Sequence, residues 1–208
     1  MTDLVTAARA FAQEVHAGQE RKAAPGVPYV AHLQDVFQRV QHAGGDEIVQ
    51  AVAWLHDAPE DQGVQLAELG ERFGPEVAAT VAAVTEMKFD DHGRKRSWLD
   101  RKKDLLLGFD GLDQVVAHRA AQVFAADAAA ACDDLAQGLA TSNPADFWGR
   151  FNAPPTWIVA YQAARLEVVR RELGEQHPLA IELSGAYRRL LVAAGFVPEQ
   201  VPSLFSLS

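Results

Sequence analysis

The sequence predicts an all-α protein that folds as a single domain. Apolar residues recur every three or four positions along nearly the whole chain, which is the spacing of a buried helix face. No segment has the alternating, β-branched pattern of a strand, and no repeat or low-complexity linker divides the chain. A chain of 208 residues buries about two-thirds to three-quarters of its unfolded surface, so the core needs no disulfide or cofactor.

Helix start and stop signals divide the first half of the chain into elements. A first helix, capped by Thr2, ends before Gly18, and a second runs through His32 to the glycine pair at 44–45. Asp46 is a favourable N-cap residue, so a third helix follows it and ends near the polar pair at 56–57.

The second half of the chain is punctuated in the same way. Pro75 opens a helix at its first position, and Ser97 with an acidic residue three positions on forms a start that resembles a capping box. The alanine-rich stretch from about Asp113 to Leu139 predicts one long helix, and two more follow, the first ending at Gly174 and the second running over about 178–195. We therefore expect a domain over residues 1–196 and a C-terminal tail over 197–208.

Composition excludes several classes of protein. The net charge of −9 argues against broad contact with nucleic acid. No apolar run approaches the roughly 18 residues that span a bilayer, so no membrane partner is expected. The single Cys132 and the lack of a secretory leader pattern favour a cytosolic protein. The negative net charge does not exclude a small anionic substrate, because six basic residues lie within one ten-residue window. They either offset substrate charge or form a solvated helix start and loop. The six are Arg94, Lys95, Arg96, Arg101, Lys102 and Lys103.

Four polar residues are candidate metal ligands: His32 in PYVAH, His56 and Asp57 in AWLHD, and Asp127 in FAAD. A lone histidine among apolar neighbours is more often a core residue, but two hydrophilic side chains directly after an apolar run are costly to bury unless they bind something. Asp127 lies in an alanine-rich stretch with no partner nearby in sequence. Two imidazoles and two carboxylates suit Mn²⁺, Fe²⁺ or another divalent ion better than structural zinc, which prefers a closed tetrahedral shell.

Glu60 and Asp61 follow the His-Asp pair at once, in HDAPED. Because Pro59 disfavours helical geometry at the preceding residue and removes a backbone donor, we expect the helix to end or kink here. The two carboxylates would then lie on a turn at the edge of the site. Acidic residues at helix ends are also common on surfaces, so their role depends on the neighbouring ligands.

Three motifs occur in a fixed order. They are HAGQERKAAPGVPYVAH over residues 16–32, WLHDAPED over 54–61, and FGPEVAATVAAVTEMK over 73–88. They resemble H-x-G-Q-x-R-K…P-Y-x-x-H, L-H-D-x-x-E-D and F-G-x-E-V…V-x-x-V-T-K of the hydrolase domain of RelA/SpoT-class enzymes, which belong to the HD superfamily and degrade the alarmone ppGpp. The likeness covers roughly residues 5–175 and extends to stand-alone small alarmone hydrolases.

This resemblance implies an HD-type helical bundle with a central metal site. The four candidate ligands named above, His32, His56, Asp57 and Asp127, would hold Mn²⁺. Glu60 and Asp61 would form the catalytic acidic pair, Arg21 would lie against the guanine face, and Lys22 would interact with phosphate. The implied reaction is metal-dependent hydrolysis of the 3′-pyrophosphate of (p)ppGpp, giving GDP or GTP and pyrophosphate, with Glu60 or Asp61 positioning the water or handling its proton.

The chain departs from the family pattern around Asp127. Where the family has L-A-D-x-x-x-N followed by arginine, Ala131 replaces the asparagine and Asp133 the arginine, and Phe124 stands where lysine is common. These changes concern nucleotide contacts rather than ligands. They leave two alternatives open: an HD phosphohydrolase acting on another phosphorylated nucleotide, or a catalytically silent alarmone-binding or scaffold protein.

Overall fold

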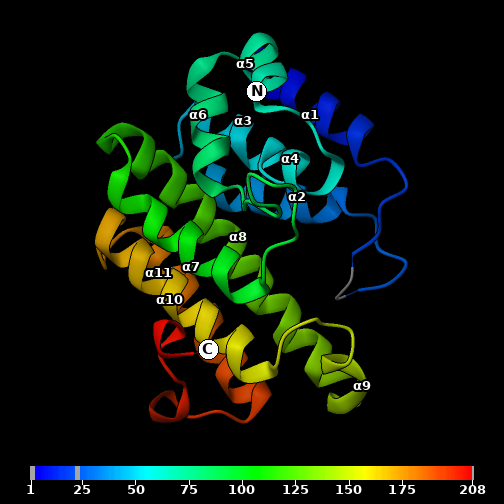
Figure 1. Ribbon diagram of the computed structural model, residues 1–208, viewed down its shortest axis with the longest axis vertical. Coiled ribbons are helices and arrows are strands. Elements are labelled where there is room, and N and C mark those ends of the chain that lie inside the picture. Colours follow the sequence, from blue (N-terminus) through cyan, green and yellow to red (C-terminus); the bar gives the residue numbers. More distant parts are fainter. Residues whose placement is uncertain (1–2, 22–23, 208) are drawn as a thin grey trace.

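A computed structural model of the chain describes residues 3–21 and 24–207, and in these ranges it contains helices but no strand (Figure 1). The predicted all-α fold is therefore confirmed. The helices are α1 (Asp3–Val15), α2 (Val30–His42), α3 (Glu47–Leu55), α4 (Ala58–Gln62), α5 (Leu66–Phe73), α6 (Pro75–Val84), α7 (Trp98–Gly108), α8 (Gln114–Thr141), α9 (Pro144–Trp148), α10 (Pro155–Leu173) and α11 (Pro178–Ala194), with short 3-10 turns at Phe109–Gly111, Pro198–Gln200 and Leu204–Ser206.

The predicted helix starts are confirmed by their capping contacts. The side chain of Asp46 accepts a hydrogen bond from the backbone N–H of Val49, and that of Asp113 from the N–H of Val115, both at 2.9 Å. Ser97 accepts from the N–H of Asp100 at 3.0 Å and donates its hydroxyl to the carboxylate of that residue. The cap expected from Thr2 lies outside the described residues.

Three helices were not predicted from the sequence: α5, α9, and α4, which lies where a turn was expected. The residue before α5 is Gln65, whose side chain makes no capping hydrogen bond. This helix forms because Leu69 and Phe73, one turn apart, are buried in the core. α9 has a sequence signal, since Asn143 caps it and Pro144 occupies its first turn, but its five residues are too few to show a helical period.

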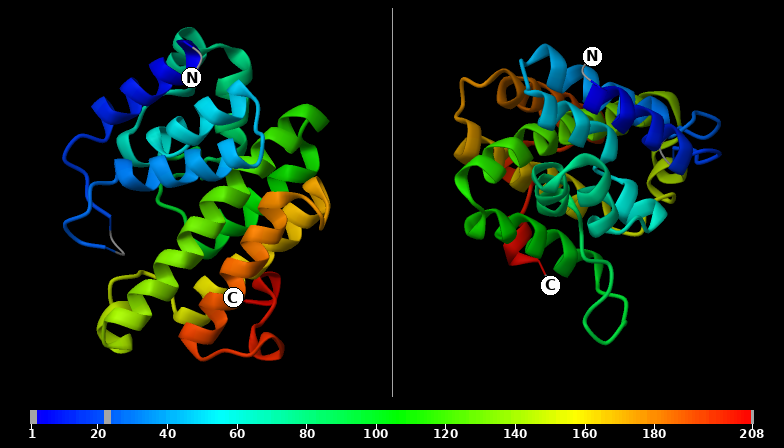
Figure 2. Two further views of the ribbon diagram at one scale, coloured as in Figure 1. Left: turned by 180° about the vertical axis from the view of Figure 1, so that it is seen from behind. Right: turned by 90° about the horizontal axis from the view of Figure 1, so that it is seen from above.

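The long helix α8 forms the centre of the molecule (Figures 1 and 2). It packs against α10 and α11 of the C-terminal half of the chain and against α2, α3 and α6 of the N-terminal half. Its alanines are the reason for this position, because eight of the eleven are buried and allow other helices to approach closely. Residues in the middle of α8 therefore lie where the N-terminal and C-terminal helices meet.

Gly138 in α8 provides the closest of these approaches. A Cβ atom built on it would lie 2.0 Å from the ring of Phe147 in α9. The ring is fully buried, so it has no free space to move into. Glycine at this position is therefore required by packing rather than by backbone conformation.

Residues 197–207 fold back onto the helices. Leu204 is buried, its 3-10 turn contacts α10, and the carbonyl of Leu207 accepts a hydrogen bond from Lys103 of α7 at 2.7 Å. Across the described residues, no helix combines the length and the apolar character needed to cross a bilayer. The cytosolic location stays a prediction.

Candidate active site

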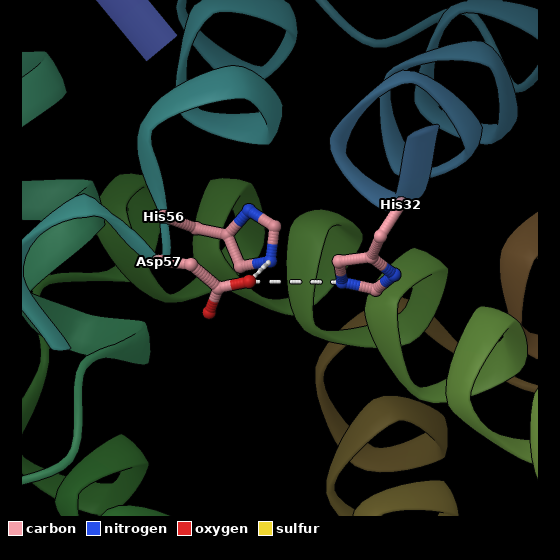
Figure 3. Close-up of side chains that lie close together, drawn as sticks. All are labelled: His32, His56 and Asp57. Atoms are coloured by element: carbon pink, nitrogen blue, oxygen red, sulfur yellow. Dashed lines mark ion pairs between the residues drawn. The ribbon is translucent and has the colours of Figure 1, made fainter. Parts of the chain in front are cut away.

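Three helices bring the four candidate metal ligands together. His32 comes from α2, His56 and Asp57 from the break between α3 and α4, and Asp127 from the middle of α8. Figure 3 shows His32, His56 and Asp57 pointing toward one another, and their ligand atoms all lie within 4.8 Å of each other. Asp127 adds a second carboxylate, with Oδ1 at 3.0 Å from Nε2 of His32 and 3.9 Å from Nε2 of His56.

The hydrogen bonds of His56 fit a metal ligand. Its Nδ1 lies 3.0 Å from the carbonyl oxygen of Ala53, which fixes the proton on Nδ1 and directs Nε2 into the cluster. Nε2 is fully buried and has no hydrogen-bond partner, although Asp57 Oδ2 lies 3.1 Å away. A buried ring nitrogen without a partner is costly, and a divalent ion bound between these atoms would remove that cost.

The cluster also concentrates negative charge. Burial raises the pKa of the Asp57 carboxyl, but His56 outweighs this effect and brings the pKa down to about 2. Burial also opposes ionisation of Asp127, yet Arg165 and the histidines hold its pKa well below its usual range. Burial lowers the pKa of the His56 imidazole, and the carboxylates of Asp57 and Asp127 more than reverse this, so its pKa lies above the usual range.

Glu60 and Asp61 lie directly beyond the ligand pair. α3 ends at Leu55 and a separate helix, α4, begins at Ala58 with Pro59 in its first turn, so the expected break is present. The carboxylates occupy this short helix rather than a turn. Asp61 is held by Gln19, whose Nε2 donates to Oδ2 at 2.8 Å, and by Lys88, whose Nζ lies 3.5 Å from Oδ1. Burial raises the pKa of Glu60.

A cavity of about 190 Å³ adjoins the cluster. It is lined by three of the ligands, by Glu60, and by Lys102 of the basic window. Four further lining residues had no role predicted from the sequence: Tyr29, Glu86, Tyr161 and Arg165. Lys102 extends from α7 with its Nζ 4.5 Å from the centre of the Tyr161 ring, and burial lowers its pKa to about 8. A lysine side chain and an aromatic ring thus line the cavity beside the candidate metal ligands.

Arg165 of α10 was missed, because its partner lies far away in sequence. Its Nη2 donates to Oδ2 of Asp127 at 2.6 Å and to the carbonyl oxygen of Phe124 at 2.8 Å. The guanidinium lies over the Phe124 ring, 4.3 Å from its centre, and the side chain is only 4% exposed. The available signal was an arginine at helical spacing from Ile158, Tyr161 and Val169, on the buried face of α10.

The residues expected to bind substrate are only partly described. Arg21 forms an ion pair with Asp134 of α8, and its Nη2 lies 3.3 Å from Nδ1 of His32. Arg21 therefore lies next to the cluster. It contacts the ring nitrogen of His32 that faces away from the other ligands. Lys22 lies outside the described residues. Tyr29, part of the PYVAH motif, donates its hydroxyl to Oδ2 of Asp57 at 2.5 Å and so orients that ligand.

Most of the basic window is already paired. Carboxylates hold four of its members, in the pairs Arg94–Asp90, Arg96–Asp104, Arg101–Glu86 and Lys102–Glu86. Only Lys102 of this window lines the cavity beside the ligands. The window is therefore not one continuous basic surface, and its contribution to the cavity is a single cation.

The three departures from the family pattern lie in different surroundings. Phe124 lines the cavity beneath Arg165. Asp133 is turned away toward α2 and α11, where it pairs with Arg39 at 3.1 Å and Arg189 at 2.7 Å. Ala131 is half-buried, one turn beyond Asp127. The substitution at 133 thus serves helix packing, whereas those at 124 and 131 lie close to the ligands.

Curated relatives match less than half of the chain. A probable guanosine-3′,5′-bis(diphosphate) 3′-pyrophosphohydrolase of Synechocystis sp. is 38% identical over 84 residues, which are 40% of this chain and 11% of that protein. The enzyme of the same name from Xenopus tropicalis, MESH1, is 37% identical over 87 residues, which are 41% of this chain and 49% of that protein. The chain thus spans about a tenth of the first relative and half of the second.

Solved structures share the fold over most of the chain. A metazoan ortholog of SpoT, described as hydrolysing ppGpp, superposes with a TM-score of 0.67 at 22% identity, covering 91% of this chain and 96% of that one. A Listeria monocytogenes protein superposes with a TM-score of 0.64 at 22% identity, covering 79% and 99%. The model of the HD domain family matches residues 8–135, which contain all four clustered ligands and α4, and the chain belongs to this family.

Proposed function

We propose that the protein is a metal-dependent phosphohydrolase that removes the 3′-pyrophosphate of (p)ppGpp and gives GDP or GTP and pyrophosphate. The observation that carries this proposal is the convergence of two imidazole nitrogens and two carboxylate oxygens beside a cavity that also contains Glu60 and Lys102. The names of the Synechocystis and Xenopus relatives, each of which matches about 40% of this chain, support ppGpp as the substrate.

Mn²⁺ is the ion that the resemblance favours, and Fe²⁺ or another divalent ion has the same ligand chemistry. Held by His32, His56, Asp57 and Asp127, it would supply Lewis acidity and lower the pKa of a bound water. Tyr29 holds Asp57, and Ala53 fixes the tautomer of His56, so these neighbours orient the ligands before substrate binds.

The surroundings of the acidic pair suggest a division of roles. Glu60 lines the cavity, and its raised pKa suits a group that takes a proton from water near neutral pH. Asp61 does not line this cavity, and its Oδ2 accepts a hydrogen bond from Gln19. Lys88 lies about equally close to both carboxylates, 3.6 Å from Oε1 of Glu60 and 3.5 Å from Oδ1 of Asp61. We therefore assign proton transfer from the water to Glu60. Asp61, through its hydrogen bond with Gln19, holds α4 against the segment that follows α1.

Substrate binding rests on Lys102, Tyr161, Arg21 and Lys22. Lys102, which pairs with Glu86 at the cavity wall, would contact the pyrophosphate, and the ring of Tyr161 offers an apolar wall. Arg21 would stack on the base once it leaves Asp134. The hydrolysed bond joins phosphorus to the 3′ oxygen, so the 3′ hydroxyl of the product must receive a proton.

A second candidate, hydrolysis of another phosphorylated nucleotide, is favoured by one observation. Phe124 and Ala131 place no side-chain donor near the ligands, where the family pattern has lysine and asparagine. The third alternative, a silent binding protein, is disfavoured because Glu60 and Asp61 are present and lie beside the cluster.

The test is pyrophosphate release from ppGpp by the purified protein with Mn²⁺, beside a panel of other nucleotides. We expect turnover that is lost in Glu60→Gln, while Mn²⁺ binding persists because Glu60 is not a ligand. Glu47→Gln, on the exposed start of α3, is the matched control. No ppGpp turnover at high enzyme concentration refutes the substrate, and loss of bound metal in Glu60→Gln refutes the division between ligands and acidic pair.

A further inference from the structure

Asp127 is the clustered ligand that pairs with the buried guanidinium of Arg165. Its two carboxylate oxygens have different partners: Oδ1 faces Nε2 of His32 at 3.0 Å, and Oδ2 accepts from Arg165 at 2.6 Å. The same Nη2 of Arg165 also donates to the carbonyl oxygen of Phe124, one turn earlier on α8. Arg165 thus binds both the backbone and the side chain of the turn that presents Asp127.

This arrangement cannot relax easily. The Arg165 side chain is 4% exposed and is enclosed by the rings of Phe124 and Tyr161, 4.3 and 5.4 Å from the guanidinium carbon. An arginine does not lose its proton in proteins, so the charge that holds Oδ2 is permanent. Only Oδ1 is then free to coordinate an ion.

The number of oxygens that a site offers decides which ion it prefers. Ca²⁺ takes six to eight oxygen ligands and often binds both oxygens of a carboxylate, whereas Mn²⁺ and Fe²⁺ accept imidazole and fewer ligands. A carboxylate that is restricted to one oxygen therefore disfavours Ca²⁺ more than Mn²⁺.

We propose that Arg165 is a positioning residue that restricts Asp127 to one coordinating oxygen and so makes the site select Mn²⁺-like ions over Ca²⁺. The inference rests on the proposed metal site, but not on the identity of the nucleotide. A merely structural Arg165 would hold α10 against α8 without changing the relative affinity for two ions of equal charge.

The experiment measures Mn²⁺ and Ca²⁺ dissociation constants of the chelator-treated full chain by calorimetric titration. The quantity compared is the ratio of the two constants, because a change in net charge affects both divalent ions alike. In Arg165→Met, Oδ2 is released, and we expect the preference for Mn²⁺ over Ca²⁺ to fall about tenfold, the lower end of the effect of losing a residue that orients a ligand.

Two further variants keep the test decisive. Val169→Ala removes buried volume one turn along α10 without touching Asp127, so it should lower stability and leave the ratio unchanged. Arg165→Lys keeps the positive charge but loses the planar guanidinium, and it replaces Arg165→Met in the test if that variant does not fold. We expect a smaller fall in the preference for Mn²⁺ over Ca²⁺. An unchanged ratio in the Arg165 variants, or an equal shift in Val169→Ala, overturns the proposal.

The outcomes separate this inference from the proposed function. Normal ion binding without ppGpp turnover refutes the substrate and leaves the role of Arg165 intact. Failure of the unaltered protein to bind either ion overturns the metal site and, with it, the role of Arg165.

Discussion

The two ligand aspartates should differ in what they contribute to the stability of the metal-free protein. Asp127 pairs with Arg165, which is buried and cannot lose its proton. Asp57 contacts the Tyr29 hydroxyl and two histidines, all of which can adapt to a neutral neighbour. Both residues are predicted ligands, so Asp127→Asn and Asp57→Asn should both weaken metal binding, and only the first should leave a permanent buried charge.

The expected difference follows from these partners. Removing one member of a buried ion pair costs about 3–5 kcal/mol, and the 27% exposure of the Asp127 side chain favours the lower value. In Asp57→Asn the amide oxygen still accepts from Tyr29 and His56 can release its proton, so the cost is about 1 kcal/mol.

Urea and thermal unfolding at pH 8 with a chelator measure this difference directly. About 2 kcal/mol corresponds to a gap of about 4–8 °C in Tm for a chain of this size. Equal losses of stability, or a larger loss in Asp57→Asn, would contradict the reasoning, since they would mean that Arg165 finds another partner.

Four further outcomes are expected. Mn²⁺ at a hundredfold excess over Kd should raise the free energy of unfolding of the unaltered protein by about 2.7 kcal/mol, and His56→Ala should abolish this rise. A normal metal stoichiometry in His56→Ala would show that His56 is not a ligand. Because burial lowers the pKa of Lys102 to about 8, the lysine is cationic below that pH and neutral above it, so kcat/KM should fall above pH 8, and Lys102→Arg should shift this decline upward. Gly138→Ala should lower the free energy of unfolding by about 1–3 kcal/mol despite the better helix propensity of alanine, because its Cβ would overlap the Phe147 ring; a gain in stability would show that the ring can move. Ala131→Asn should raise ppGpp turnover about tenfold if the missing side chain is uncompensated, and a loss of activity together with a better alternative nucleotide would favour the second candidate function.

The parts of the fold that were predictable are those with a local signal. Asp46, Ser97 and Asp113 carry oxygens that cap helices, and Pro75 begins one, so these boundaries follow from neighbouring residues. α5 has no such signal, because its start lacks a capping side chain and its stability comes from the burial of Leu69. Packing against helices distant in sequence therefore determines whether α5 forms.

The candidate site divides in the same way. His32, His56 and Asp57 lie in short recognisable motifs, and the structure brings them together as expected. Arg165 could not be assigned, because the atom it binds belongs to another helix and nothing near it in sequence names that partner. The roles of the site residues as ligands, acid and base stay predictions.

The position of the ligands in the chain has a consequence for folding. His32 and Asp127 lie in opposite halves of the sequence, whereas α5 and α6, or α2 and α3, are joined by short loops. Closing a long loop costs more entropy than closing a short one, so the docking of α8 against α2 follows the formation of the local helix pairs. An ion therefore finds its four ligands only in chains that have completed this docking. The metal supplied during expression would act on the yield of fully folded protein and not on the rate of the first folding steps.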